Sequence, residues 1–218
     1  YGKITLPTAS DGYTNEEGRV NVNERNVVVR DENGVIPNAY VVYNEDGSVS
    51  VDLPEGNGIS HHNRVTVTVL DSVAKPIEGV EVTVKDVNEV QFTGTTDSEG
   101  KVFVPPLSED YTDSEGVAVV NGINAVLSDE TKPIEGAFIT IADNQINVKL
   151  PETAVFDYHN RITLALTDAE GNPVKDMTVV FTDGNGNTET IISDENGKAI
   201  VPPVHKDMTD TEGKAVVS

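Results

Sequence analysis

Apolar and polar residues alternate along several short segments of the chain. Val65, Val67 and Val69 alternate with threonines, and segments 80–84 and 146–150 show the same pattern. A period of two places the apolar side chains on one face of a β-strand, so these segments predict strands with one buried face. Glycine and proline recur between them as turn residues, and no segment combines helical periodicity with caps. The pattern predicts an all-β fold made of antiparallel β-sandwiches.

The sequence also repeats itself. Residues 63–66 (Asn-Arg-Val-Thr) recur as residues 160–163 (Asn-Arg-Ile-Thr), 97 residues later, and the match continues without a gap over more than fifty positions. Residues 14–18 match residues 112–116 at a spacing of 98. Self-similarity at a fixed period is typical of tandem repeats. The period of 97–98 residues is close to the size of one small domain.

Each period contains two related halves, in which a strand ends in aspartate and a turn with proline leads to the next strand. Half a period, about 48 residues, is too short to bury an adequate core, so we expect one domain per period. We therefore predict one module over residues 1–120 and a second over residues 121–218. Residues 1–22 resemble the tail of a preceding repeat.

Composition narrows the class of protein. The formal net charge is −22, which disfavours binding to nucleic acid phosphates and to anionic lipid. There is no cysteine, which excludes disulfides and zinc–thiolate sites, and no apolar run is long enough to span a membrane. The chain begins at Tyr1 without methionine or a leader, so we interpret it as a piece of a longer protein.

One stretch resembles a known family. Residues 160–168 (Asn-Arg-Ile-Thr-Leu-Ala-Leu-Thr-Asp), 171–174 (Gly-Asn-Pro-Val) and 193–199 (Ser-Asp-Glu-Asn-Gly-Lys-Ala) follow one another at characteristic spacings. This pattern resembles the bacterial immunoglobulin-like repeats of the invasin and intimin type, and also prealbumin-like modules of Gram-positive surface proteins. The resemblance covers residues 63–120 and 160–218. It implies tandem immunoglobulin-like sandwiches, an extracellular location at the cell surface, and roles in spacing and adhesion.

Calcium is the first candidate ligand, because Ca²⁺ takes several oxygen ligands and acidic loops supply them. The candidate ligands are the acidic residues near turns, namely Asp97, Glu99, Asp110, Asp113, Asp194, Glu195, Asp207 and Asp210. None of these runs has the spacing of an EF-hand loop. The alternative is that these carboxylates stabilise turns on an acidic surface.

Other chemistry finds less support in the sequence. An internal isopeptide bond between a lysine and an asparagine would suit a cysteine-free chain, with Lys101 and Lys198 as candidates and ordinary surface lysines as the alternative. His62 and His159 lie a whole repeat apart, so we interpret them as packing positions. The chain lacks a Gly-x-Ser-x-Gly elbow, a phosphate-binding glycine loop and a His-Glu-x-x-His motif. We therefore do not expect an enzyme.

These observations favour a structural function. The leading prediction is a stalk or spacer segment of a secreted bacterial cell-surface protein, in which repeat modules set reach and stiffness. One alternative is an adhesin segment that binds a host protein or a glycan through exposed loops. Another is an accessory module of an extracellular enzyme or a surface layer. We expect a monomer whose partners are the neighbouring repeats of the same chain, without nucleic acid and without membrane insertion.

Overall fold

The computed structural model describes residues 9–204, and its chain divides into two compact units, Tyr1–Pro106 and Leu107–Ser218. Residues 9–204 form nineteen β-strands and no helix. The all-β class predicted from the alternating pattern is confirmed. Each unit consists of two sheets that enclose a core formed by that unit's own residues.

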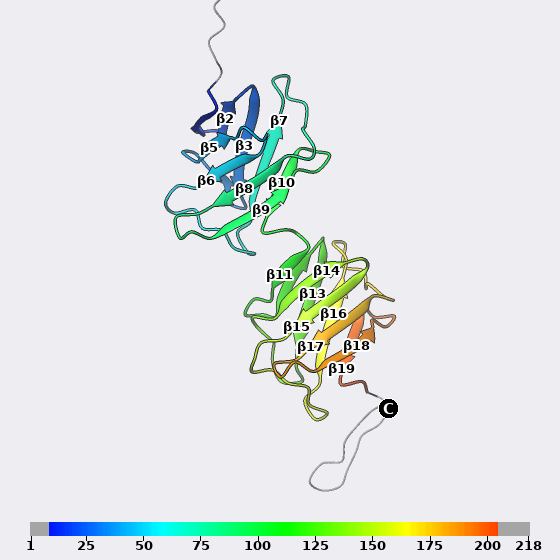
Figure 1. Ribbon diagram of the computed structural model, residues 1–218. Helices are drawn as coiled ribbons and strands as arrows, with labels where there is room; N and C mark the ends of the chain where they lie inside the picture. The colour runs from blue at the N-terminus through cyan, green and yellow to red at the C-terminus, as the bar shows by residue number, and fades with distance from the viewer. Residues whose placement is uncertain (1–8, 205–218) are drawn as a thin grey trace, which may run out of the picture. The chain divides into compact units, whose positions relative to one another are not determined.

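Unit 1 contains ten strands in two sheets (Figure 1). The first sheet has the order β1 (Asp11–Tyr13), β5 (Tyr40–Tyr43), β6 (Val49–Asp52), β8 (Glu81–Lys85) and β9 (Gln91–Thr95). The second has the order β10 (Lys101–Val104), β7 (Val65–Leu70), β3 (Arg25–Asp31) and β2 (Arg19–Val22), with β4 (Gly34–Val35) paired to β3.

Unit 2 repeats this arrangement. Its first sheet has the order β11 (Glu109–Tyr111), β14 (Phe138–Ala142), β15 (Gln145–Lys149), β17 (Thr178–Thr182) and β18 (Thr188–Ile192). Its second sheet has the order β12 (Val117–Val120), β13 (Ile123–Ser128), β16 (Ile162–Thr167) and β19 (Lys198–Val201). The sequence repeat is therefore a repeat of topology as well.

One strand pair in each unit departs from the predicted antiparallel arrangement. β6 pairs with β8 in parallel, and β15 pairs with β17 in parallel. The reason is the path of the chain between them. After β6 a long loop carries the chain to β7 in the opposite sheet, and β8 then returns beside β6 in the same direction. Parallel neighbours need such a crossover connection.

The boundary between the units also differs from the prediction. The sequence places it at residue 120, whereas the structure places it between Pro106 and Leu107. Strands β11 and β12 precede residue 121, yet they pair with β14 and β13 and so belong to unit 2. A periodic sequence repeats every feature once per period, so self-comparison gives the period but not where a unit begins.

Burial follows the alternation that the sequence predicts. Along β7 the side chains of Val65, Val67 and Val69 are buried and those between them are half-buried. β16 shows the same order with Ile162, Leu164 and Leu166. Inward-facing residues of both sheets meet in the core, while threonine, asparagine and charged residues face solvent.

Each half of unit 1 contains a buried threonine hydroxyl that hydrogen-bonds two backbone groups. Thr14 Oγ1 donates to Ile36 O (2.7 Å) and accepts from Ala39 N (2.8 Å). Thr96 Oγ1 makes the equivalent bonds, donating to Ile77 O (2.8 Å) and accepting from Val80 N (2.9 Å). Both threonines are almost fully buried. Each hydroxyl thus satisfies two backbone groups that the sheets leave unpaired.

Unit 2 contains two buried hydroxyls at the corresponding positions. Thr112 Oγ1 accepts from Ala137 N (2.8 Å). Ser193 Oγ donates to Val174 O (2.9 Å) and accepts from Met177 N (3.0 Å). We call these four buried hydroxyls the hydroxyl latches. Their recurrence shows that the two halves of each unit are built on one local plan.

Candidate functional site

The acidic turns predicted as calcium ligands bind their own backbone. Asp97 Oδ1 accepts from Glu99 N (2.8 Å) and Lys101 N (3.0 Å). Asp113 Oδ1 accepts from Glu115 N and Val117 N, both at 2.9 Å. Each carboxylate therefore holds a turn closed in the way that aspartate commonly does.

Asp194 has the same role in unit 2, where its Oδ1 accepts from Asn196 N and Lys198 N, both at 2.8 Å. The hydrogen bond from Lys198 N is the main cause that lowers the pKa of Asp194. Glu195, next to it, is exposed. Glu99 is also exposed and pairs with Lys101 Nζ at 2.8 Å.

Asp110 differs from the other candidates because its side chain is 3% exposed. Its Oδ1 accepts from Tyr111 N (2.9 Å) and its Oδ2 accepts from Val119 N (2.7 Å). The carboxylate therefore joins β11, in one sheet, to β12, in the other.

The described residues do not bring these carboxylates together. In residues 9–204 no group of three or more histidine, cysteine, aspartate or glutamate side chains is placed to hold a metal ion. Asp207 and Asp210 lie outside the described residues. The calcium prediction thus gains no support from this part of the chain. Neither isopeptide candidate is buried, since Lys101 is 42% exposed and Lys198 is exposed.

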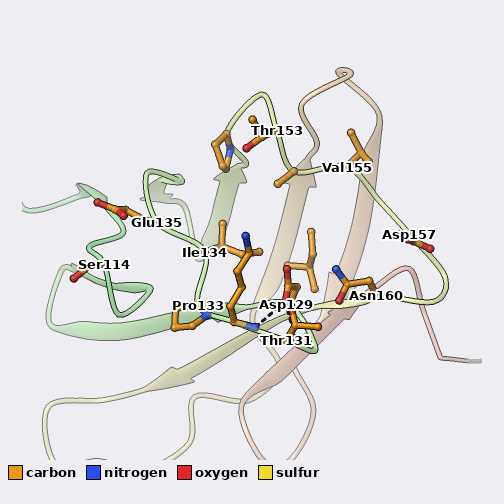
Figure 2. Close-up of a pocket in the computed structure, with 14 residues that line it drawn as sticks. Ser114, Asp129, Thr131, Pro133, Ile134, Glu135, Thr153, Val155, Asp157 and Asn160 are labelled. Atoms are coloured by element: carbon orange, nitrogen blue, oxygen red, sulfur yellow. Dashed lines mark hydrogen bonds between the residues drawn. The ribbon is translucent and has the colours of Figure 1, made fainter.

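A surface cavity of about 650 Å³ lies among the loops at one end of unit 2 (Figure 2). Turn residue Ser114, the segment 129–135 between β13 and β14, and the segment 151–162 that leads into β16 line it. We call it the loop cavity. Its lining residues are Ser114, Asp129, Thr131, Lys132, Pro133, Ile134, Glu135, Pro151, Thr153, Ala154, Val155, Asp157, Asn160 and Ile162.

Asp129 accepts the hydrogen bonds that hold residues 129–132, on one side of the loop cavity. Its Oδ1 accepts from Thr131 N (2.7 Å), Thr131 Oγ1 (2.6 Å) and Lys132 N (2.9 Å). Partial burial raises the pKa of Asp129, but the hydrogen bonds from Thr131, Lys132 and Asn160 outweigh this effect and hold the pKa below its usual value. Asp129 is therefore a carboxylate at neutral pH.

Asn160 connects the two loops of the cavity. Its Oδ1 accepts from Glu130 N at 3.2 Å, and its side chain also bonds Asp129. In Figure 2, Asn160 and Asp129 lie together beside Thr131, with Asp157 further along the same loop as Asn160. Thr153 and Val155 lie earlier in this same loop.

The equivalent loops of unit 1 are joined by a different pair of side chains. Asn33, which corresponds to Thr131, donates from Nδ2 to Asn63 Oδ1 at 3.2 Å. Asn63, which corresponds to Asn160, in turn donates to Gly58 O at 3.0 Å. In unit 2 the Thr131 side chain binds Asp129 instead, and the loops are joined by the hydrogen bonds of Asn160 to Glu130 N and Asp129. The two units therefore join the same pair of loops through different hydrogen bonds.

Sequence reasoning missed the loop cavity. Asn160 stands in the motif that revealed the repeat, but there it served only to align the two copies. The useful signal was the departure between copies, with Thr131 and Lys132 in place of Asn33 and Gly34. Sequence alone could not tell which way the Thr131 hydroxyl turns.

The chain matches no protein-family model, no curated protein and no solved structure. Among residues 9–204 there is also no helix that is long and apolar enough to cross a membrane.

Proposed function

We propose that this chain is a spacer segment of a secreted bacterial cell-surface protein, built from immunoglobulin-like repeat modules. The observation that supports it most is that each repeat forms a complete sandwich with its own core and the same hydroxyl latches. A module that buries its core without help from its neighbours can be added in any number, so the number of copies sets the reach.

Two further observations fit a spacer. Strand β10 ends at Val104 and β11 begins at Glu109, so only residues 105–108 connect the last strand of one unit to the first strand of the next. The chain carries 37 acidic and 15 basic residues, and the resulting mutual repulsion favours solubility and disfavours collapse of modules onto one another. A monomer whose contacts are with its own neighbouring repeats follows from this proposal.

Mechanical unfolding of single molecules tests the spacer proposal. Two separate unfolding events are expected, each releasing on the order of 300 Å of chain, since one period extends to about 3.3–3.6 Å per residue. Small-angle X-ray scattering of the same chain should give an elongated particle. A single event that releases the whole chain, or a compact particle, would contradict the proposal.

A further inference from the structure

Asparagine followed directly by glycine occurs in five places, at residues 33–34, 57–58, 121–122, 185–186 and 196–197. Such a pair can modify itself. The backbone nitrogen of the glycine attacks the side-chain carbonyl carbon of the asparagine, and the side-chain nitrogen leaves as ammonia with the proton that the glycine nitrogen gives up. Water then opens the cyclic imide to aspartate or isoaspartate. Glycine favours the attack because it has no Cβ and a flexible backbone.

The fold restrains the attacking nitrogen in three of these pairs. In each of them the glycine N–H holds a turn closed by donating to a turn aspartate. The bonds are Gly34 N to Asp31 Oδ1 (3.0 Å), Gly186 N to Asp183 O (2.9 Å) and Gly197 N to Asp194 O (2.9 Å). The nitrogen must give up this bond before it can attack, so the reaction is slowed there.

The glycines of the other two pairs have no such bond. Within residues 9–204, the N–H groups of Gly58 and Gly122 donate no hydrogen bond. Gly122 lies in the tight turn between β12 and β13, where the pairing of Val120 with Ile123 holds the backbone on both sides. Gly58 lies outside every strand, in the loop between β6 and β7, so it is the less restrained of the two.

Asn57 itself is also weakly held. Its side chain makes no hydrogen bond within the described residues, and its backbone nitrogen makes a long bond of 3.3 Å to Pro54 O. Its side chain is half-buried and Gly58 is exposed, so water can reach an imide formed here. Unit 2 has Ala154 and Val155 at the corresponding positions, so the pair has no counterpart there.

A change at residue 57 would act on the contact that holds this loop. Asp86 Oδ2 accepts from Ile59 N at 3.2 Å, and it lies 3.8 Å from the place that a Cβ on Gly58 would take. Either product adds a negative charge close to the Asp86 carboxylate, and like charges repel. Isoaspartate also lengthens the backbone by one carbon atom. Both effects weaken the bond from Ile59 N.

We propose that Asn57 and Gly58 form a self-modification site, at which asparagine converts to aspartate and isoaspartate, and that the conversion loosens the loop between β6 and β7 from Asp86. Water is the single co-reactant, and ammonia is the product released. This inference goes beyond the spacer function and does not rest on it, because every contact that it uses lies within unit 1.

The test follows all five pairs in the intact chain. The chain is incubated at mildly alkaline pH, where the glycine nitrogen loses its proton more readily, and peptide mapping by mass spectrometry measures conversion at each asparagine. Asn57 should convert first and Asn121 second. The three pairs with a bonded glycine should be slower than Asn57 by roughly tenfold, since one hydrogen bond is lost before the attack. Hydrogen exchange should show that the Ile59 amide exchanges faster in the converted chain.

Gly58→Ala is the matched variant. Gly58 has no left-handed backbone, and the atom nearest to an added Cβ is 3.8 Å away, so alanine fits while its methyl group obstructs the attack. Conversion of Asn57 should fall to the rate of the bonded pairs or below, with the rate at Asn121 unchanged. In concentrated urea, where no fold restrains the glycines, all five pairs should convert at similar rates.

Three outcomes would overturn the proposal. One is a folded chain in which Asn57 converts no faster than the pairs with a bonded glycine. Another is the same order of rates in urea as in the folded chain, which would assign the differences to neighbouring residues in the sequence. The third is a converted chain whose Ile59 amide exchanges as slowly as before.

Discussion

Units 1 and 2 build the same pair of sheets from side chains of different volumes. In unit 1, Val27 lies opposite Val69 in the core; in unit 2 the corresponding pair is Ala125 opposite Leu166. The loss of volume on one strand is partly offset by a gain on its neighbour. The comparison shows that the fold requires a well-filled core of inward-facing apolar side chains. It does not require a particular side-chain volume at each core position.

The large aromatic side chains also occupy different positions in the two units. Val84 pairs with Phe92 across β8 and β9, whereas Phe181 pairs with Glu189 across β17 and β18. The ring has therefore moved from the edge strand to its inner neighbour. Phe92 is half-buried, while Phe181 is fully buried and is the largest buried side chain of the chain's described part. Unit 2 thus depends on one large residue where unit 1 uses several valines.

The largest effect is expected from removal of that ring. Phe181→Ala should lower the free energy of unfolding of unit 2 by about 3–5 kcal/mol, because it deletes buried apolar surface and leaves a cavity. Urea unfolding gives this loss, and hydrogen exchange assigns it to unit 2. Phe92→Ala is the control in unit 1 and should cost clearly less. Equal losses would show that the two cores do not differ in this way.

A turn glycine should give the next largest effect. Gly116 has φ +75°, and a Cβ there would collide with Leu127 O, whereas Gly122 has φ +78° and open space around it. Gly116→Ala should cost about 2–4 kcal/mol, combining left-handed strain with overpacking. Gly122→Ala should show the left-handed strain alone, about 1–2 kcal/mol. Thermal or urea unfolding measures both, and matching values would rule out the collision as the cause.

The hydroxyl latches provide a third test. Thr112→Val keeps the shape of the side chain but leaves Ala137 N without its acceptor in a buried place, so a loss of about 1–3 kcal/mol is expected. Thr96→Val should have a similar effect in unit 1, where Val80 N loses the same partner. The control is Thr83→Val, on an exposed face, which should change stability little. If Thr112→Val is as mild as this control, the latches are not important for stability.

The smallest effect at neutral pH is expected from Asp183→Asn, which keeps the side-chain shape and removes one charge. Asp183 is buried; burial raises its pKa, but hydrogen bonds from Asn187, Phe156 N and Asn185 N outweigh this and lower it. The ionised Asp183 carboxylate therefore stabilises the fold at pH values above about 3.9, the usual pKa of aspartate in unfolded chains. This stabilisation is lost as the pH falls through the lowered pKa of Asp183 in the folded chain.

The measurement is the stability of both forms of the chain as a function of pH. The original chain should be more stable than Asp183→Asn at neutral pH, and the difference should shrink on acidification. Asp86→Asn should give the same pattern in unit 1, since Asp86 holds the equivalent loop and its pKa is lowered in the same way. A difference that stays constant down to low pH would contradict the assigned role.

Much of the fold could be predicted because inner strands carry a clear alternation. Segments 65–69, 80–84 and 146–150 correspond to β7, β8 and β15 to within a residue at each end. The edge strands β9 and β18 have no fully buried position, so their pattern gives little signal. The loop cavity could not be predicted, because segments 129–135 and 151–162, which line it, are loops whose paths no alternating pattern specifies.

The carboxylates of Asp110 and Asp113 have a consequence for molecules crowded together at high concentration. β12 is an edge strand, and the exposed side chain of Val119 makes it an attractive template for pairing with another chain. Asp110 and Asp113 already occupy the N–H groups of Val119 and Val117. An approaching strand would have to displace two negative charges to form its ladder, so the fold itself protects this edge against aggregation.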